Sequence, residues 1–268
     1  MKSIVFIGCG NMARPIIARC VSQGVFAPEN IYVYDISPLA ADFCRETGVV
    51  FTETLGEGVE RADAVFLAVK PQVLPSLLPE IAPMVNGSGK TLISIAAGKT
   101  TDYIASFFTE GTPVARIFPN LCASVGAAVS AYCGNASVTP DDLEKVRETA
   151  ASIGEAYALD EEYFAIFGVL GGCGPAYAFM FIKALADAAE NAGLAPGLAR
   201  LAAAGMVEGA AKLLKTSDAG ADELVRRVCS PGGTTIEGVN SLKNDGLSDT
   251  VARAFKASLD RDAELAKG

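Results

Sequence analysis

The sequence contains no histidine, and this absence excludes several classes of enzyme. Without an imidazole, the chain cannot carry a Ser-His-Asp triad, a histidine-ligated zinc site or the acid/base histidine of many dehydrogenases. We therefore expect no metal ion. Any substrate reduced here must receive its proton from another side chain or from water, or must arrive already protonated.

Basic residues are also scarce, with 22 Lys and Arg against 31 Asp and Glu and a net charge of -9. Nucleic acids and anionic membrane surfaces need a basic face, so neither is an expected partner. An anionic small molecule remains compatible with this charge if backbone N–H groups bind it. The 268 residues, half of them hydrophobic, suffice for one large or two moderate domains.

The seven cysteines are scattered and include no C-x-x-C pair, which is typical of reduced thiols in the cytosol. The N-terminal apolar run is broken at Gly8 and is too short for a secretory signal. The more apolar segment 175–193 carries Lys183, Asp187 and Glu190, so we assign it to a protein core or interface. We expect a cytoplasmic protein.

A glycine-rich turn near the N-terminus is the feature that organises the first part of the chain. Residues 3–7 form an apolar run that predicts a strand, followed by the motif GCGNMA at residues 8–13 and then a helical pattern. Gly8 would allow the tight turn, and Gly10 would allow a pyrophosphate to approach the backbone at the helix N-terminus. The pattern predicts a bound dinucleotide, although an ordinary strand-turn-helix also favours glycine.

An acidic residue follows the next predicted strand, at residues 30–35. Asp35 lies ~25 residues after the glycines, where a ribose-binding carboxylate is expected. Such a carboxylate accepts hydrogen bonds from an unphosphorylated ribose and repels a 2′-phosphate, which favours NADH. Ser37 and the helix start behind it could still receive a phosphate, and Asp35 could also be a simple turn residue.

Alternating strand and helix patterns continue to about residue 160. We predict further strands at residues 48–51, 64–69, 91–95, 114–118, 124–132 and 156–159, and helices at residues 37–47, 56–61, 73–83, 101–108 and 140–152. Repeated β-α units with nearly continuous apolar strands indicate an α/β fold with a parallel, doubly wound sheet. We assign residues 1–160 to this Rossmann-type, dinucleotide-binding domain.

The strand signal disappears from about residue 161. Helices are predicted at residues 175–193, 196–215, 221–229, 234–244 and 247–267. Residues 161–268 should therefore form an all-α domain. Its alanine-rich faces and few bulky residues would make a thin core, so we hypothesise a homodimer with interleaved helices.

Two polar residues follow predicted strands, at the sheet edge where ligands of doubly wound folds collect. Lys70, in the segment AVKPQ at residues 68–72, would face the cofactor, or it could be a solvated surface lysine. Asn120 ends the segment RIFPN and could bind the nicotinamide side of the dinucleotide, or it could serve the turn alone.

The loop SPGGTT at residues 230–235 directly precedes a helical pattern. Such a loop presents free N–H groups at a helix N-terminus, which can bind a carboxylate without an arginine. The hydroxyl groups of Thr234 and Thr235 can donate or accept hydrogen bonds. An ordinary capping loop is the alternative.

Two anion-binding segments in two domains suggest that a dinucleotide and a small acid react together. Without histidine, the most easily handled hydride acceptor is a cyclic imine. It can be protonated in solution, and it needs from the protein only orientation and a hydrogen bond to its nitrogen.

The chain resembles the pyrroline-5-carboxylate reductases over essentially its full length. The resemblance rests on GCGNMA, AVKPQ and RIFPN, on GPAY at residues 174–177, and above all on SPGGTT with Gly246. It implies reduction of Δ1-pyrroline-5-carboxylate to L-proline by NADPH, with NADH as the alternative, in the last step of proline biosynthesis. It also implies a Rossmann domain and a helical domain that forms dimers, which in some members assemble into a decamer.

The resemblance also implies roles for individual residues. Thr235 would form a hydrogen bond with the ring nitrogen and is the candidate catalytic residue. The residues implied to bind the substrate are Ser230, Gly232, Gly233 and Thr234. The N–H groups of Gly233 and Thr234 would hold the substrate carboxylate. The expected cofactor residues are Gly8, Gly10, Asn11, Met12, Asp35, Ser37, Ala68, Val69, Lys70, Pro71 and Asn120.

Three parts of the chain depart from the family pattern. Leu121 and Cys122 follow Asn120 where Thr-Pro is frequent, and Gly171 and Cys173 replace the usual serines before Pro175. Asp35 stands where NADPH-preferring members often have neutral or basic residues.

Two rival interpretations remain open at this level. β-Hydroxyacid dehydrogenases and imine reductases share the expected architecture, but the first group needs a lysine with an asparagine one helical turn later, where Lys183 is followed by Asp187. The second rival interpretation is a non-enzymatic regulator that binds a dinucleotide. Only the loop 230–235 argues against it.

Overall fold

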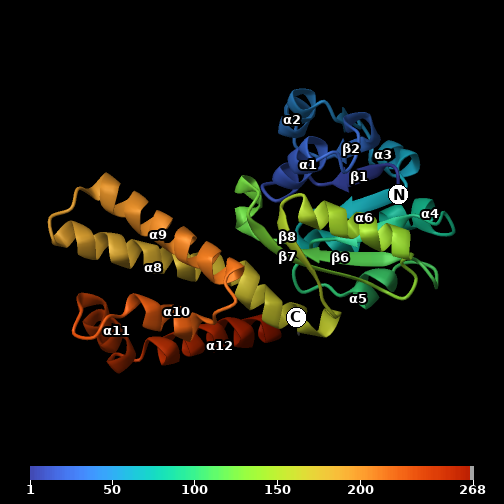
Figure 1. The fold of residues 1–268 in the computed structure, drawn as a ribbon. Helices are drawn as coiled ribbons and strands as arrows, with labels where there is room; N and C mark the ends of the chain where they lie inside the picture. Colours follow the sequence, from blue (N-terminus) through green and yellow to red (C-terminus); the bar gives the residue numbers. More distant parts are fainter. Residues whose placement is uncertain (266–268) are drawn as a thin grey trace. The chain divides into compact units, whose positions relative to one another are not determined.

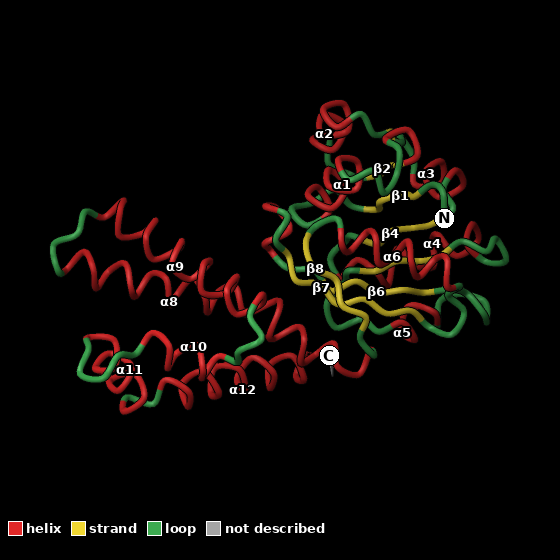
Figure 2. The backbone as a smooth tube through the Cα atoms, viewed as in Figure 1, coloured by secondary structure: helices red, strands yellow, loops and turns green. Residues whose placement is uncertain are grey.

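The computed structural model describes residues 1–265, which form two compact units (Figure 1). The first unit comprises Met1–Gly172 together with the end of the last helix from Arg261, and the second comprises Cys173–Asp260. The first unit combines a sheet with helices, and the second is entirely helical (Figure 2).

Eight strands form one sheet in the order β3-β2-β1-β4-β5-β6-β7-β8. The strands are β1 (Ile4–Ile7), β2 (Ile31–Tyr34), β3 (Val50–Phe51), β4 (Ala64–Leu67), β5 (Thr91–Ser94), β6 (Val114–Phe118), β7 (Ala128–Gly134) and β8 (Gly154–Ala158). The neighbours from β3 to β6 pair in parallel, β7 runs antiparallel to β6, and β8 is parallel to β7. The predicted doubly wound sheet is confirmed as a mixed, mostly parallel sheet.

Helices cover both faces of this sheet. They are α1 (Ala13–Ser22), α2 (Leu39–Thr47), α3 (Leu55–Arg61), α4 (Leu74–Val85), α5 (Thr101–Ala105) and α6 (Pro140–Ala151). Successive strand residues point to opposite faces, so Ile4 and Phe6 pack against α1 while Val5 and Ile7 pack against α3 and α4. Because both faces are buried, the neighbouring strands β1 and β4 are apolar at every position.

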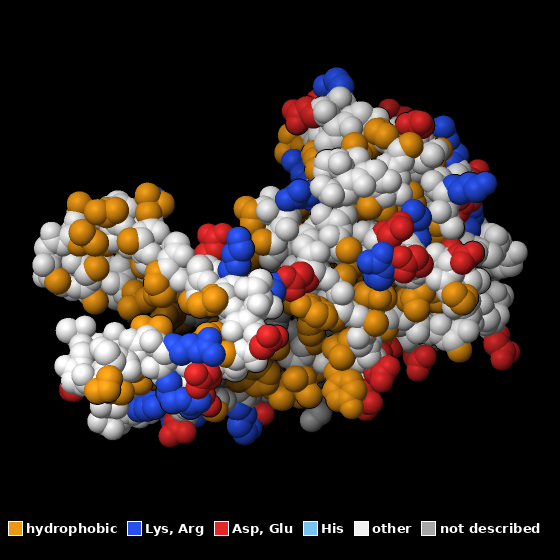
Figure 3. All heavy atoms as spheres, viewed as in Figure 1, with side chains coloured by type: hydrophobic (Ala, Val, Ile, Leu, Met, Phe, Trp, Pro, Cys, Tyr) orange, Lys and Arg blue, Asp and Glu red, His pale blue; other side chains and the backbone are white. Residues whose placement is uncertain are grey.

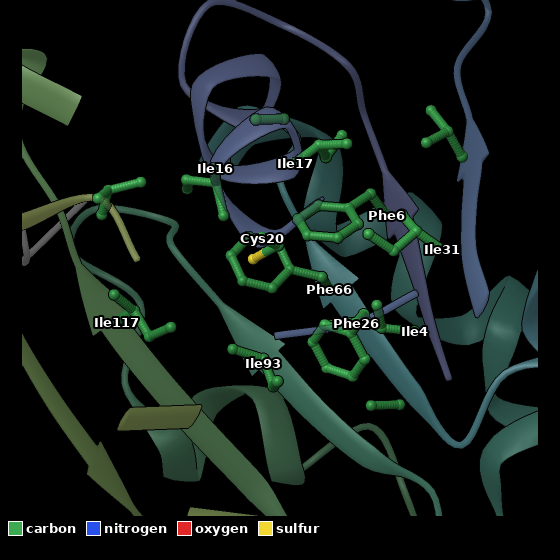
Figure 4. Close-up of a cluster of buried hydrophobic side chains, with 14 of the residues drawn as sticks. Ile4, Phe6, Ile16, Ile17, Cys20, Phe26, Ile31, Phe66, Ile93 and Ile117 are labelled. Carbon is green, nitrogen blue, oxygen red and sulfur yellow. The ribbon is translucent and has the colours of Figure 1, made fainter. Parts of the chain in front are cut away.

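The larger core cluster lies between the sheet and the layer formed by α1, α2 and α6. Phe6 and Phe66 stack at its centre with ring centroids 4.5 Å apart, and Ile16, Ile17 and Cys20 from α1 close over them (Figure 4). These contacts hold β1 and β4 side by side, which positions the loops that follow both strands.

The strand predicted at residues 124–132 begins later than expected. Leu121–Val125 form a 3₁₀ helix because the Asn120 side chain accepts a hydrogen bond from Cys122 N–H at 3.0 Å. Gly126 ends this turn in the left-handed region at φ 72°, and β7 starts at Ala128. Alternation in the sequence does not reveal a turn set by one side-chain acceptor.

The glycine-rich segment before Pro175 is helical, so helical structure begins before residue 175, where the predicted helix starts. α7 (Phe164–Phe167) leads into a π-helix (Gly168–Cys173) and then into α8 (Gly174–Asn191). A Cβ on Gly168 or Gly172 would lie within about 3 Å of the Phe118 ring, so these glycines permit close packing. Their role depends on a partner from β6, which the local sequence does not show.

A buried ion pair joins β6 to the segment before α7. The Arg116 guanidinium contacts the Glu161 carboxylate at 2.6 Å and lies over the Phe164 ring at 4.8 Å. The same carboxylate accepts hydrogen bonds from the Thr101 N–H and hydroxyl. Desolvation, the largest contribution, raises the pKa of Glu161, but the hydrogen bonds from Thr101 and Arg116 together bring this pKa below its ordinary value.

The helical unit is built from α8, α9 (Pro196–Thr216), α10 (Ala221–Val228), α11 (Thr234–Asn244) and α12 (Leu247–Leu265). All five predicted helices of this region are present, and residues 266–267 of the last one lie outside the described residues. Within the unit, the Tyr177 hydroxyl of α8 forms a 2.6 Å hydrogen bond with Ser258 of α12. Tyr177 belongs to the GPAY segment, so one function of this segment is to connect two helices.

Candidate functional site

The glycine turn follows β1 with the conformation that its sequence predicts. Gly8 has φ 99°, and its N–H donates to the Tyr34 carbonyl at 2.9 Å. A Cβ on Gly8 would lie 2.8 Å from the Ala68 carbonyl oxygen, so a larger residue would push β1 and β4 apart. A Cβ on Gly10 would meet no protein atom within 4 Å and would instead enter the open space beside the turn.

Asp35 lies at the end of β2 and binds the glycine turn directly. Its Oδ2 accepts a hydrogen bond from Cys9 N–H at 2.5 Å, and its Oδ1 accepts one from Ser37 N–H at 2.7 Å. The Asp35 carboxylate is therefore fixed between two loops. The Cys9 thiol is buried, and this burial raises its pKa, so we regard Cys9 as a packing residue.

A cavity of about 420 Å³ opens at the carboxyl ends of β1, β2 and β4. Its walls include the predicted residues Gly8, Gly10, Asp35, Ala68, Val69 and Lys70. This position beside the central strands is where doubly wound sheets bind the adenosine half of a dinucleotide.

A second cavity of about 300 Å³ lies at the ends of β4, β5 and β6. It shares residues 68–70 with the first cavity, and Met12 and Pro71 also line it. Strand order reverses between β1 and β4, and the two cavities lie on either side of residues 68–70. Together they can take the two halves of an extended dinucleotide.

Three predicted cofactor residues do not line either cavity. Asn11 is exposed on the glycine turn, and Ser37 contributes its N–H to Asp35. Asn120 is buried, and its Nδ2 donates to the Gly171 carbonyl at 2.9 Å while its Oδ1 accepts from Cys122. The structure thus gives the Asn120 side chain a turn role, and its contact with a nicotinamide stays a prediction.

The cavities also contain residues that the sequence interpretation did not select. Val73, Leu77 and Glu80 line the first cavity, and Ala97 and Phe118 line the second. The spacing 73, 77, 80 places the first three on one face of the turn and helix after β4, a signal that could have identified them. Ala97 follows β5 and Phe118 ends β6, and ligand contacts are common at these strand ends.

The loop of residues 230–235 connects α10 to α11. Gly232 has φ 69°, and Gly233 N–H donates to the Ser230 carbonyl at 3.0 Å, which closes a tight turn. Gly233 is the N-cap of α11 and contributes no side-chain cap. Within residues 1–265, neither the Thr234 nor the half-buried Thr235 hydroxyl forms a hydrogen bond. The loop therefore offers two hydroxyls that form no hydrogen bond with the described residues, whereas the Gly233 N–H is engaged by the Ser230 carbonyl.

The arrangement of the acidic and cysteine side chains of the described residues bears on metal binding, and that of Lys183 and its neighbour on α8 bears on a dehydrogenase site. No group of three or more Cys, Asp or Glu side chains in residues 1–265 is arranged to hold a metal ion. Lys183 on α8 pairs with Asp187 at 2.5 Å, and both side chains are exposed. The carboxylate of Asp187 thus neutralises the lysine that a β-hydroxyacid dehydrogenase would use.

Two family models match separate parts of the chain. Residues 161–265 match the family described as pyrroline-5-carboxylate reductase dimerisation. Residues 3–98 match the family described as NADP oxidoreductase, coenzyme F420-dependent.

Several full-length relatives are described as pyrroline-5-carboxylate or pyrroline carboxylate reductases. The chain is 36% identical over 267 residues to a pyrroline-5-carboxylate reductase of Escherichia coli, with 99% of each chain covered. A solved pyrroline-5-carboxylate reductase from Coxiella burnetii superposes with a TM-score of 0.93 at 31% identity, covering 98% of both chains. A Plasmodium falciparum pyrroline carboxylate reductase with NADP bound superposes with a TM-score of 0.88 at 27% identity, covering 99% of this chain and 98% of that one.

Proposed function

The chain belongs to the pyrroline-5-carboxylate reductase family, and from this membership we propose that it reduces Δ1-pyrroline-5-carboxylate to L-proline. It is an NAD(P)-dependent oxidoreductase of proline biosynthesis. The observation that carries this conclusion is the agreement of relatives over 99% of both chains. We propose residues 1–160 as the functional cofactor domain and 161–268 as the substrate-binding and dimerisation domain.

The residues of the N-terminal domain fit a nicotinamide dinucleotide. Open space beside Gly10 and the start of α1 leave room for a pyrophosphate, and residues 8–12 would hold it through backbone N–H groups. Residues 68–71 would line the nicotinamide side, where the second cavity lies. When bound, the nicotinamide supplies the hydride, and the protein supplies orientation.

We assign the substrate carboxylate to the loop of residues 230–235. The Thr234 N–H begins α11, where no side chain caps the helix, and the helix dipole there favours an anion. The Gly233 N–H donates to the Ser230 carbonyl at 3.0 Å, so it would bind the carboxylate as a shared, bifurcated donor. Ser230 and Gly232 shape the turn that presents these groups. This arrangement explains how a chain with net charge -9 can bind an acid without an arginine.

Thr235 is the residue proposed to contact the reacting ring. Its hydroxyl has no hydrogen-bond partner among the described residues, and it can accept a hydrogen bond from the N–H of a protonated imine or donate one to the nitrogen of a neutral imine. Because the cyclic imine can arrive protonated, the protein needs no histidine for proton transfer. Thr235 would then orient the ring and stabilise the amine as it forms.

Purified protein should oxidise NADPH or NADH when Δ1-pyrroline-5-carboxylate is added, measured as loss of nicotinamide absorbance. An acyclic 2-oxo acid serves as the control substrate and should give no turnover, since it lacks the cyclic imine. Turnover of the oxo acid would favour a hydroxyacid dehydrogenase. The absence of turnover with either cofactor would contradict the proposed reaction.

We propose that the helical unit associates with a second copy of the chain. Its surface carries exposed apolar side chains, among them Phe179, Met180, Leu198, Leu201 and Leu213 (Figure 3). The helix Glu161–Asn191 is long and apolar enough to cross a membrane by composition, with 17% of its most apolar window buried. Its charged residues and the match to a dimerisation family favour a protein partner instead.

Sedimentation equilibrium should therefore give at least twice the mass of one chain at micromolar concentration. Such an assembly would bury the apolar side chains that the single chain exposes. A fit to a single chain, independent of concentration, would refute self-association. We also propose a cytoplasmic location, because all seven cysteines are free thiols.

A further inference from the structure

We propose that Gly168 and Gly172 of the π-helix are positioning residues for the nicotinamide half of the cofactor and that they act through the Phe118 ring. The inference rests on the proposed function, because it assumes that the 300 Å³ cavity holds the nicotinamide. Neither glycine lines this cavity, so both act on it indirectly.

The first observation is a row of three side chains at the end of β6. Arg116, Phe118 and Asn120 are two residues apart, and all three contact the segment before α8. Arg116 pairs with Glu161 at 2.6 Å. Asn120 donates to the Gly171 carbonyl at 2.9 Å. Phe118 stands between these two contacts, which hold the π-helix in place against its ring.

The second observation is the lack of space between this ring and the π-helix. A Cβ on Gly168 would lie 2.9 Å from Phe118 Cζ, and a Cβ on Gly172 would lie 3.0 Å from Cε1. The two glycines are four residues apart, so they present one helix face to the ring. Alanine is the better helix former, so helix propensity does not explain glycine at these positions, whereas space for the ring does.

The third observation is that Phe118 also lines the second cavity, together with Met12 and Pro119. A methyl group on Gly168 or Gly172 would push the tip of the ring away from the π-helix. The side chain yields more readily than the helix, which the neighbouring contacts hold. The position of Phe118 in the cavity wall then changes.

The nicotinamide ring needs a defined orientation to give up its hydride, and a misplacement of about 1 Å can cost about 100-fold in rate. Gly168→Ala and Gly172→Ala should therefore each raise the dissociation constant of NADPH by about 5- to 50-fold. Cofactor fluorescence with the full-length protein measures this constant.

A ligand that lacks the nicotinamide shows whether the effect is confined to that half. Calorimetry with 2′,5′-ADP should give affinities within about twofold of the unsubstituted protein, because this ligand reaches only the adenosine side. NADH and 5′-ADP form a second pair of ligands with the same expectation. A general loss of structure would weaken both members of a pair alike.

A double variant tests whether the ring transmits the effect. Phe118→Leu removes the tip of the ring, and in this background Gly172→Ala should cause no further loss of NADPH affinity. Gly56→Ala is the matched control. Gly56 lies in α3 and lines neither cavity, and its Cβ would meet Met84 Sδ at an ordinary 3.7 Å.

The outcomes separate this inference from the proposed reaction. Loss of NADPH affinity alone, absent in the Phe118→Leu background, supports the inference. Equal loss for both ligands, unchanged affinities, or the same loss without the ring overturns it, while turnover of pyrroline-5-carboxylate leaves the proposed function standing. Gly172 is exposed, so Gly172→Ala decides the matter if Gly168→Ala does not fold. Failure of the unsubstituted protein to bind either nucleotide, together with no turnover, overturns both.

Discussion

Replacing Thr235 by alanine should lower kcat/KM for pyrroline-5-carboxylate by about 10- to 1000-fold, the scale of losing one oriented hydrogen bond. The reason is that the Thr235 hydroxyl is the group proposed to contact the ring nitrogen, and the chain has no histidine to replace it. Steady-state kinetics with saturating cofactor measures the effect.

Two further variants show whether the hydroxyl itself is responsible. Thr235→Ser keeps the donor and should recover most of the activity. Ser241→Ala, on the same helix α11, removes an exposed hydroxyl that bonds only to Asp245 and should leave kcat/KM unchanged. Unaltered kinetics in Thr235→Ala would remove Thr235 from the mechanism.

Replacing Arg116 by leucine should lower the free energy of unfolding of the N-terminal unit by about 2–4 kcal/mol, because it leaves Glu161 without its cationic partner. The Arg116 side chain is 6% exposed and that of Glu161 is 25% exposed, so the effect falls below that of a fully buried pair. Urea denaturation followed by circular dichroism measures it. Arg45→Leu breaks the exposed pair with Asp42 and should cost less than about 1 kcal/mol.

The same substitution should change the dependence of stability on pH. The pKa of Glu161 is lowered in the folded chain, so its contribution is complete above the ordinary value of 4.5 and is lost as pH falls through the lowered pKa. Arg116→Leu should flatten this loss below pH ~4.5, because one hydrogen bond that lowers the pKa is gone. An equally steep acid transition in both proteins would show that Glu161 does not depend on Arg116.

Local backbone chemistry made much of the N-terminal unit predictable. Residues 3–13 contain an apolar strand, the glycines of a tight turn and a helix start, and the structure forms all three in order. Gly8 needs its positive φ whatever surrounds it, and Asp35 follows a strand that must pair beside β1. The strands alternate with helices, so a mostly parallel sheet followed from chain order.

Contacts between distant segments explain what the sequence did not predict. Asn120 is bound by Gly171, 51 residues away, and Gly168 and Gly172 lack a side chain where the Phe118 ring packs against them. The antiparallel direction of β7 depends on the 3₁₀ turn at Leu121–Val125, which one side-chain acceptor stabilises. Neither periodicity nor composition contains this information.

The sequence by itself determined the cofactor turn, because a short glycine motif acts through its own backbone. The alternation of strand and helix patterns determined the layered architecture, and the motifs shared with a known family indicated the reaction class. Only the tertiary structure packed the Phe118 ring against Gly168 and paired Arg116 with Glu161. Both contacts join residues at least 45 positions apart in the chain. The packing of helices and loops on the sheet brings such groups together, and burial then strengthens the electrostatic interaction between Arg116 and Glu161.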